Sequence, residues 1–275
     1  MRNILHKIET FFQERYERDI SIYAESFLDT TINERVVATA SKTADDYLAL
    51  LESNKDEASL LLDSLTNAYS EFFRNPLTFA LLEQFVLPKL TNENSKLPSG
   101  EIRVWSAGCS AGQEPYSLAM LIEHFKTTHL INSRFRIFAT DISTKQIEIA
   151  RQGFYDVKAL QNTRMRFIKK YFEESKNGFL LDDKIKKQVD FSLFDLLNNG
   201  SSAPPASIFG DFDLIMCSNV LFYYRPEIRK MILSKFHRSL KSDGFFITGE
   251  AEVSVVKSFG KFRQFASPAP IFTKS

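Results

Sequence analysis

From residue 103 onward, short apolar runs alternate with amphipathic helical segments, and this alternation restricts the possible folds more than any other feature. The helical segments include 115–126 and 226–240. The predicted strands are 103–107, 135–141, 189–195, 212–219 and 244–249. Strands that alternate with helices form a mostly parallel sheet with both faces covered. The last two apolar segments, 261–266 and 270–275, predict a closing antiparallel hairpin. The chain is therefore expected to be of the α/β class.

The residues before this region predict a separate helical part. Residues 1–68 show helical periodicity without strand-like alternation, and Thr43 is an expected N-cap with Asp45 and Asp46 in the first turn. Residues 69–100 contain the segment FFR, then Asn75 and Pro76 as cap and first-turn proline of a helix, then a polar linker. We predict domains at 1–68, 69–100 and 101–275.

The segment between the second and third strands is too long for a single crossover helix. It runs from residue 151 to 188 and includes the sequence NGFLLDDKIKK. We therefore expect a small inserted subdomain at about 155–188.

The bulk composition of the 275 residues is that of an ordinary globular protein, with 44% hydrophobic and 25% charged residues. The formal net charge of +1 predicts no general attraction to nucleic acid or to anionic membranes. The N-terminus lacks the apolar core of a signal peptide and no stretch is long enough to span a bilayer, so we expect a cytoplasmic protein. Cys109 and Cys217 alone do not make a metal site, and we expect two buried thiols.

The segment GCSAG at 108–112 permits two interpretations. It fits the G-x-S-x-G pattern of a hydrolase nucleophile elbow, and it also fits a glycine loop that holds a cofactor. The hydrolase needs a histidine on a loop after Ser110, but His237 lies within a predicted helix. The cofactor loop needs an acidic residue at the tip of the next strand, and Asp141 stands there, where a carboxylate accepts ribose hydroxyls. We favour the cofactor loop.

Six blocks of the sequence resemble the CheR family of chemotaxis-receptor glutamate methyltransferases in order and spacing. They are FFRNP, VWSAGCSAGQEPYSLAM, FATDIS, ARQGFY, FDLIMCSNVLFYY and LKSDGFFITGEAE, within roughly residues 65–255. The resemblance implies a Rossmann-like class I methyltransferase domain with a seven-stranded sheet, an inserted β-subdomain and an all-α N-terminal domain. It implies S-adenosylmethionine as cofactor, S-adenosylhomocysteine as product, and glutamate side chains on the cytoplasmic domain of chemoreceptors as acceptors. We expect a monomer that needs no metal, nucleic acid or membrane insertion.

The resemblance also implies roles for individual residues. Arg74 matches the arginine that reaches the cofactor and substrate region, and Tyr223 matches the tyrosine near the transferred methyl group, so both are candidate catalytic residues. The cofactor-binding residues that the resemblance implies are Ser70, Arg74, Ala107, Gly108, Glu114, Asp141, Asp195, Leu196 and Asn219. Glu114 is expected near the methionine end of the cofactor and Asp141 on its ribose.

The sequence departs from the family pattern at four positions. Ala68 stands where asparagine is usual, Ser70 replaces threonine, Asp195 stands in place of asparagine, and Ser218 replaces an arginine. The lost arginine bears most on the substrate, because a cation there would help to hold an acidic acceptor.

The charge distribution does not decide which surface of the protein docks the substrate. Residues 1–50 hold six Lys/Arg against nine Asp/Glu, so a basic face there would need a local patch such as Arg15, Arg18 and Arg35. The inserted segment, with RMRFIKK and KIKK, is more basic and is the alternative docking surface, or a solvated charged face. Two other functions stay open: a non-catalytic cofactor-binding scaffold, and a methyltransferase for a non-receptor acidic substrate.

Overall fold

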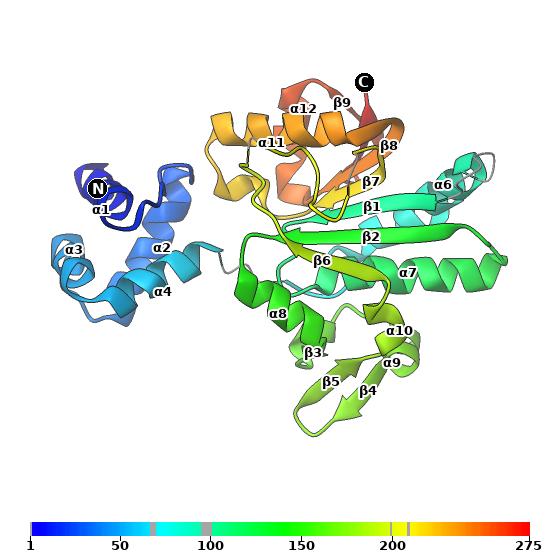
Figure 1. The fold of residues 1–275 in the computed structure, drawn as a ribbon, viewed down its shortest axis with the longest axis horizontal. Coiled ribbons are helices and arrows are strands. Elements are labelled where there is room, and N and C mark those ends of the chain that lie inside the picture. The colour runs from blue at the N-terminus through cyan, green and yellow to red at the C-terminus, as the bar shows by residue number, and fades with distance from the viewer. Residues whose placement is uncertain (1, 67–69, 95–100, 199, 208–209) are drawn as a thin grey trace. The chain divides into compact units, whose positions relative to one another are not determined.

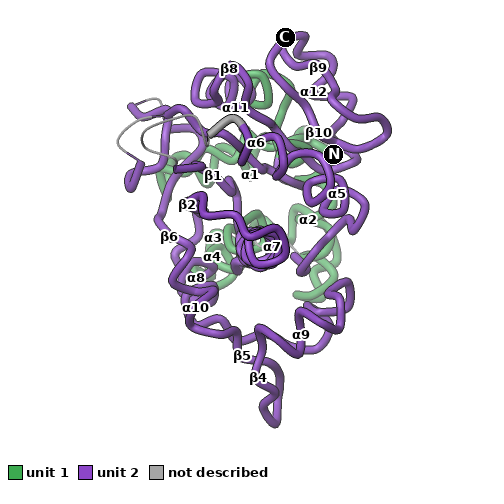
Figure 2. The backbone as a smooth tube through the Cα atoms, turned by 90° about the vertical axis from the view of Figure 1, so that its right-hand side faces the viewer, with its two compact units in different colours: residues 1–68, 221–230 green, residues 69–220, 231–275 purple. Residues whose placement is uncertain are grey.

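The structure is a computed structural model that describes all residues except 1, 67–69, 95–100, 199 and 208–209. The chain divides into two compact units, shown in different colours in Figure 2. The first comprises Met1–Ala68 together with Leu221–Lys230, and the second comprises Tyr69–Val220 and Met231–Ser275. None of the described helices has the length and hydrophobicity that a bilayer crossing requires.

The first unit is helical, as predicted. Its helices are α1 (Arg2–Tyr16), α2 (Glu25–Ala38), α3 (Ala44–Ser53) and α4 (Lys55–Thr66). Thr43 is the N-cap of α3, with its side chain accepting the N–H of Asp46. The segment 221–230 joins this unit through contacts far apart in sequence: the rings of Tyr23 and Tyr224 stack at 5.5 Å, and Arg225 donates to Glu9 Oε1 at 2.9 Å. The segment contains the 3-10 turn η3 (Leu221–Tyr223) and the start of α11 (Pro226–Ser239).

The second unit holds a seven-stranded sheet with the order β6-β2-β1-β7-β8-β10-β9. The strands are β1 (Glu101–Ala107), β2 (Arg134–Asp141), β6 (Val189–Leu193), β7 (Phe212–Cys217), β8 (Leu240–Thr248), β9 (Phe262–Ala266) and β10 (Ile271–Lys274). The first five are parallel, and β10 runs antiparallel to both β8 and β9. The predicted α/β class and the closing hairpin are confirmed.

Helices cover both faces of this sheet (Figure 1). On one face lie α7 (Gln113–His129) and α8 (Thr144–Gln152), and on the other lie α11 and α12 (Val253–Phe259). The segment before β1 contains α5 (Pro76–Leu81), the π-helical turn η1 (Leu82–Val86) and α6 (Leu87–Asn94). The order reverses between β1 and β7, because β2 and β6 extend the sheet from β1 in one direction and β7 and β8 in the other. Ligands of such sheets bind beyond the carboxyl ends of the strands at this point.

The long segment between β2 and β6 forms the expected inserted subdomain. It contains β3 (Phe154–Tyr155), the turn η2 (Lys158–Leu160), α9 (Met165–Tyr171), β4 (Phe172–Ser175), β5 (Gly178–Leu181) and α10 (Asp183–Lys186). The three strands form a second, antiparallel sheet with the order β3-β5-β4. The exact three-part domain division stays a prediction.

Several predicted strand ends differ from the structure, including the start of β8 at Leu240 rather than 244, and two of the differences concern candidate site residues. The third strand stops at Leu193 rather than 195, because the Asp195 side chain accepts the N–H of Leu197 at 2.8 Å and makes a turn. The fourth stops at Cys217 rather than 219, because Asn219 adopts a left-handed φ of 62°. Both residues therefore lie just beyond the carboxyl ends of their strands.

A buried polar cluster fixes the first unit. Glu57 is 5% exposed and accepts hydrogen bonds from Arg35 at 2.9 and 2.6 Å and from the Tyr47 hydroxyl at 2.7 Å. Burial alone raises the pKa of Glu57, but the hydrogen bonds from Arg35 and Tyr47 outweigh it, so the pKa lies below its ordinary value. Since Arg35 is held in this pair, it is not an ordinary solvated cation of a basic face.

Replacing Glu57 by alanine is expected to destabilise the helical unit by about 3 kcal/mol, because Arg35 and Tyr47 then keep buried donors without an acceptor. Urea unfolding followed by far-ultraviolet circular dichroism measures the loss. Glu14→Ala, at an exposed position of α1, is the control. A loss below about 1 kcal/mol for Glu57→Ala would show that the cluster is not a stabilising element.

Candidate functional site

The loop after β1 has a backbone that only glycine can adopt at two positions. Gly108 and Gly112 have φ values of 74° and 90°. A Cβ atom on Gly108 would lie 2.6 Å from Val220 Cγ2, and one on Gly112 would lie 2.9 Å from Ala150 Cβ. The N–H groups of Gly108 and Cys109 both donate to the carbonyl of Thr140, at 2.8 and 2.9 Å. The loop is thereby fixed to the end of β2, at the sheet edge where the strand order reverses.

Asp141 occupies the tip of β2 and joins two turns. Its Oδ2 accepts the N–H of Ser110 at 2.8 Å, and its Oδ1 accepts the N–H of Ser143 at 2.9 Å. Burial raises the pKa of this carboxyl group, and the backbone donors partly oppose that rise. A carboxylate has about four acceptor positions, so each oxygen retains capacity for a ligand hydroxyl.

Glu114, in the first turn of α7, has a carboxyl group whose pKa lies near neutral pH. The Ser106 hydroxyl donates to its Oε1 at 2.6 Å. Burial raises the pKa of Glu114 to about 7, the hydrogen bond from Ser106 opposes the rise, and the charge of Glu252 adds to it. A ligand cation beside Glu114 would favour its ionised form.

Glu252 is fully buried and links the ends of β7 and β8. Its Oε2 accepts the Thr248 hydroxyl at 2.7 Å, the N–H of Gly249 at 2.8 Å and the N–H of Asn219 at 3.0 Å. This carboxylate therefore holds Asn219 in its left-handed conformation, with the backbone of the β8 end directly beside it.

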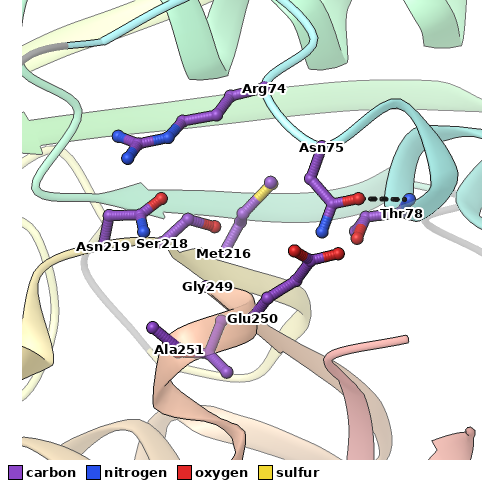
Figure 3. A pocket seen from close by; sticks show the side chains of 10 residues that line it. Arg74, Asn75, Thr78, Met216, Ser218, Asn219, Gly249, Glu250 and Ala251 are labelled. Carbon is purple, nitrogen blue, oxygen red and sulfur yellow. Dashed lines mark hydrogen bonds between the residues drawn. The ribbon is translucent and has the colours of Figure 1, made fainter. Parts of the chain in front are cut away.

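A pocket of about 250 Å³ opens at these strand ends (Figure 3). Its lining comes from the FFR segment, the start of α5, and the ends of β7 and β8. The lining residues are Arg74, Asn75, Thr78, Met216, Ser218, Asn219, Thr248, Gly249, Glu250 and Ala251.

Non-glycine residues with positive φ gather around this edge. They include Phe73 at 52°, Asn75 at 64°, Ser110 at 49° and Asn219 at 62°. Such backbone conformations cost free energy and persist where surrounding contacts enforce them. At Asn75 the enforcing contact is a helix cap, since its Oδ1 accepts the N–H of Thr78 at 3.3 Å.

The structure brings several predicted site residues together. Arg74 and Asn219 line the pocket together with Ser218. Ala107 ends β1 and is followed by Gly108, while Asp141 ends the neighbouring β2.

The remaining predicted residues come from other parts of the chain. Asp195 and Leu196 follow β6, the strand next to β2, and Leu196 is buried. Ser70 directly precedes the segment that carries Arg74. Ala68 lies outside the described residues. Tyr223 belongs to the first unit, where its ring packs on Phe27 at 4.6 Å.

The hydrolase alternative has no support in the geometry. No hydrogen bond joins a histidine to Ser110 among the residues that the structure describes. His237 packs edge-on against Phe262, and the Ser110 backbone is instead held by Asp141. Cys109 and Cys217 are buried and free, as expected.

The residues of the site that the sequence analysis did not assign include Asn75 and Thr78 in the pocket lining, and Glu250 and Glu252 after β8. The rule that identified Asp141, a polar residue directly after a parallel strand, applies equally to the two glutamates.

The sheet order, the glycine loop and the carboxylate at the tip of β2 define the class of S-adenosylmethionine-dependent methyltransferases with the Rossmann-like class I fold. Two family models match the chain: the "CheR methyltransferase, all-alpha domain" over residues 4–66 and the "CheR methyltransferase, SAM binding domain" over residues 68–270. The chain belongs to the CheR methyltransferase family, which confirms the resemblance seen in the sequence and identifies S-adenosylmethionine as its cofactor.

Curated relatives agree with this assignment. A "Chemotaxis protein methyltransferase" of Borreliella burgdorferi is 31% identical over 228 residues, which cover 82% of this chain and 79% of the relative. "Chemotaxis protein methyltransferase 1" of Pseudomonas aeruginosa is 34% identical over 70% of this chain and 69% of its own length. The "Chemotaxis protein methyltransferase" of Escherichia coli is 33% identical over 86% of this chain and 80% of its own length.

Replacing Thr78 by valine is expected to raise the free energy of unfolding by about 1 kcal/mol, because its buried hydroxyl lacks a hydrogen-bond partner among the described residues. Differential scanning calorimetry measures the change. The matched control is Thr91→Val, which removes a hydroxyl that donates to the Leu87 carbonyl at 2.9 Å and should lower stability. Equal losses for both variants would contradict the prediction.

Proposed function

We propose that this protein methylates glutamate side chains of chemoreceptors, transferring the methyl group of S-adenosylmethionine to give glutamyl methyl esters. The observation that carries the proposal is the pocket at the ends of β7 and β8. It contains Arg74, Ser218 and Asn219 at the carboxyl ends of the parallel strands, where the fold binds cofactors.

The residues present fit the charged and polar groups of the cofactor. Asp141 would accept the ribose hydroxyls. Each of its two oxygens accepts one backbone N–H and retains capacity for a further hydrogen bond. Glu114 would pair with the α-ammonium group. Arg74 would pair with a carboxylate.

The chemistry requires alignment more than proton transfer. When bound, S-adenosylmethionine supplies a methyl group on a sulfonium: an acceptor carboxylate oxygen forms the new O–CH3 bond while the S–CH3 bond breaks and its electron pair stays on sulfur. A glutamate is already ionised at neutral pH, so no general base is needed. The pocket residues thus orient the acceptor and exclude water, and positioning of this kind contributes up to about 7–11 kcal/mol in favourable models.

Tyr223 remains a proposed catalytic residue. It follows Asn219 by four positions, in the segment that leaves the pocket wall and enters the helical unit. We also propose Ser70, Ala107, Gly108, Asp195 and Leu196 as cofactor contacts, and a monomeric enzyme.

Calorimetric titration with S-adenosylhomocysteine tests the cofactor site. Asp141→Ala is expected to weaken binding by roughly 10- to 100-fold, since it removes charged acceptors for two hydroxyls. Methyl transfer is then measured with radiolabelled cofactor on a receptor cytoplasmic fragment. A glutamyl ester releases labelled methanol in alkali, whereas an N-methyl product does not. Cofactor binding without any transfer would indicate a non-catalytic scaffold, and transfer only to other acidic proteins would contradict the receptor substrate.

Cofactor affinity should depend on pH through Glu114. Its pKa of about 7 in the free protein means that it is largely protonated at pH 6, and a bound ammonium group favours the ionised form. Binding of S-adenosylhomocysteine therefore releases a proton, and affinity should rise about tenfold between pH 6 and pH 8. Titrations in two buffers of different ionisation enthalpy measure the proton release. Glu114→Gln should abolish both the release and this pH dependence, and a persistent release in that variant would assign the proton elsewhere.

A further inference from the structure

Arg74 stands in a short segment whose backbone is strained on both sides of it. Phe73 has a φ of 52° and Asn75 one of 64°, so left-handed residues flank the arginine. Such a conformation is unusual for a bulky residue such as Phe and persists only where surrounding contacts enforce it. The direction in which the Arg74 side chain extends, toward Asn219 and Ser218 (Figure 3), therefore depends on what holds its neighbours in the chain.

The inserted subdomain holds the residues directly before Arg74. The Phe72 N–H donates to the carbonyl of Ala159, in η2, at 2.9 Å. The Phe72 ring packs edge-on against the rings of Tyr155 in β3 and Phe172 in β4, with centroids 4.7 and 5.3 Å away. The segment that carries the pocket arginine is thus attached to the subdomain by both backbone and ring contacts.

Glu71 adds a charged contact to this attachment. Its side chain is 9% exposed and accepts from two side-chain amides, Gln161 on Oε1 at 2.5 Å and Asn162 on Oε2 at 2.6 Å. Both amides lie in the turn after η2, which is closed by a hydrogen bond from the Thr163 N–H to the Leu160 carbonyl at 2.8 Å. Glu71 therefore ties its segment to a hydrogen-bonded turn 90 positions further along the chain.

The ring contacts and the carboxylate contact have different effects on the segment. Apolar burial is non-directional, so the ring of Phe72 keeps the segment against the subdomain without fixing its orientation. Hydrogen bonds to an ionised carboxylate are short and directed, and Glu71 uses one oxygen for each of two donors. Since Glu71 precedes Arg74 by three positions, a change in its orientation is transmitted to the guanidinium through the strained backbone between them.

We infer that Glu71 is a positioning residue: held by Gln161 and Asn162, it directs Arg74 toward the carboxylate of the bound cofactor. The inference rests on the proposed function, in which Arg74 pairs with a carboxylate. It also gives the inserted subdomain a part in the reaction, because Gln161 and Asn162 belong to the subdomain and lie outside the set of described residues that line the pocket.

The test is a double-mutant cycle on the affinity for S-adenosylhomocysteine, which carries one carboxylate, measured by calorimetric titration of the full chain. Glu71→Ala should weaken binding roughly tenfold when Arg74 is present, because the guanidinium is misplaced. In a protein that already carries Arg74→Ala, the same substitution should weaken binding less than about twofold. Thermal unfolding followed by circular dichroism records the loss of stability, which should be equal in both backgrounds.

Further variants separate positioning from folding. Glu71→Gln keeps the volume and an acceptor oxygen, so its affinity should stay within about threefold of the wild type. Gln161→Ala combined with Asn162→Ala removes both donors from the more exposed side of the contact. This pair should reproduce the loss of Glu71→Ala without adding to it, and it replaces Glu71→Ala in the cycle if that variant does not fold. Glu174→Gln, at an exposed position of β4, is the control and should bind as the wild type does.

Equal weakening by Glu71→Ala with and without Arg74 would overturn the inference, since Glu71 would then support only the fold. Unchanged affinity of Glu71→Ala would overturn it as well, and so would wild-type affinity of Arg74→Ala. Failure of the proposed function looks different: the two substitutions would be coupled in cofactor binding, and no labelled ester would form on the receptor fragment.

Discussion

The buried carboxylate of Glu252 is the contact on which the geometry of the site depends. Three donors converge on its Oε2, from Thr248, Gly249 and Asn219. They come from the ends of two parallel strands, so one side chain fixes the pocket wall where β7 and β8 leave the sheet. The same negative charge raises the pKa of Glu114. Burial is the main cause of that raised pKa, and the group that shapes the pocket adds to it.

Much of the sheet and part of the site follow from the sequence, because strand ends can be located from apolar runs. Asp141 was found in this way and the loop with Gly108 from its glycine pattern, whereas Asn219 was assigned to the site by the resemblance to the CheR family. The same rule draws attention to Glu250 and Glu252. The local sequence does not show, however, that Glu252 accepts three hydrogen bonds in the interior whereas Glu250 lines the pocket. That difference depends on the partners that the fold supplies.

Other features are inaccessible to sequence analysis because they depend on long-range contacts. The ring of Tyr223 packs on Phe27, almost 200 positions earlier, and Arg225 pairs with Glu9. These contacts place residues 221–230 with the helical unit although the flanking strands belong to the sheet unit. The chain thus enters the helical unit one residue after Val220, directly after the pocket wall, and returns before Met231. Tyr223 in particular is held by the ring of Phe27 in the helical unit.

The charge balance of the pocket bears on what it selects. Where the family pattern has an arginine, this chain has Ser218, and the lining contains one cation, Arg74, and one anion, Glu250. A pocket with two cations would attract any cluster of carboxylates. With one cation at one end and one carboxylate at the other, the pocket attracts a carboxylate only near Arg74. Loss of the arginine therefore lowers the general attraction for acidic segments, while Arg74 still supplies a cation for one acceptor carboxylate.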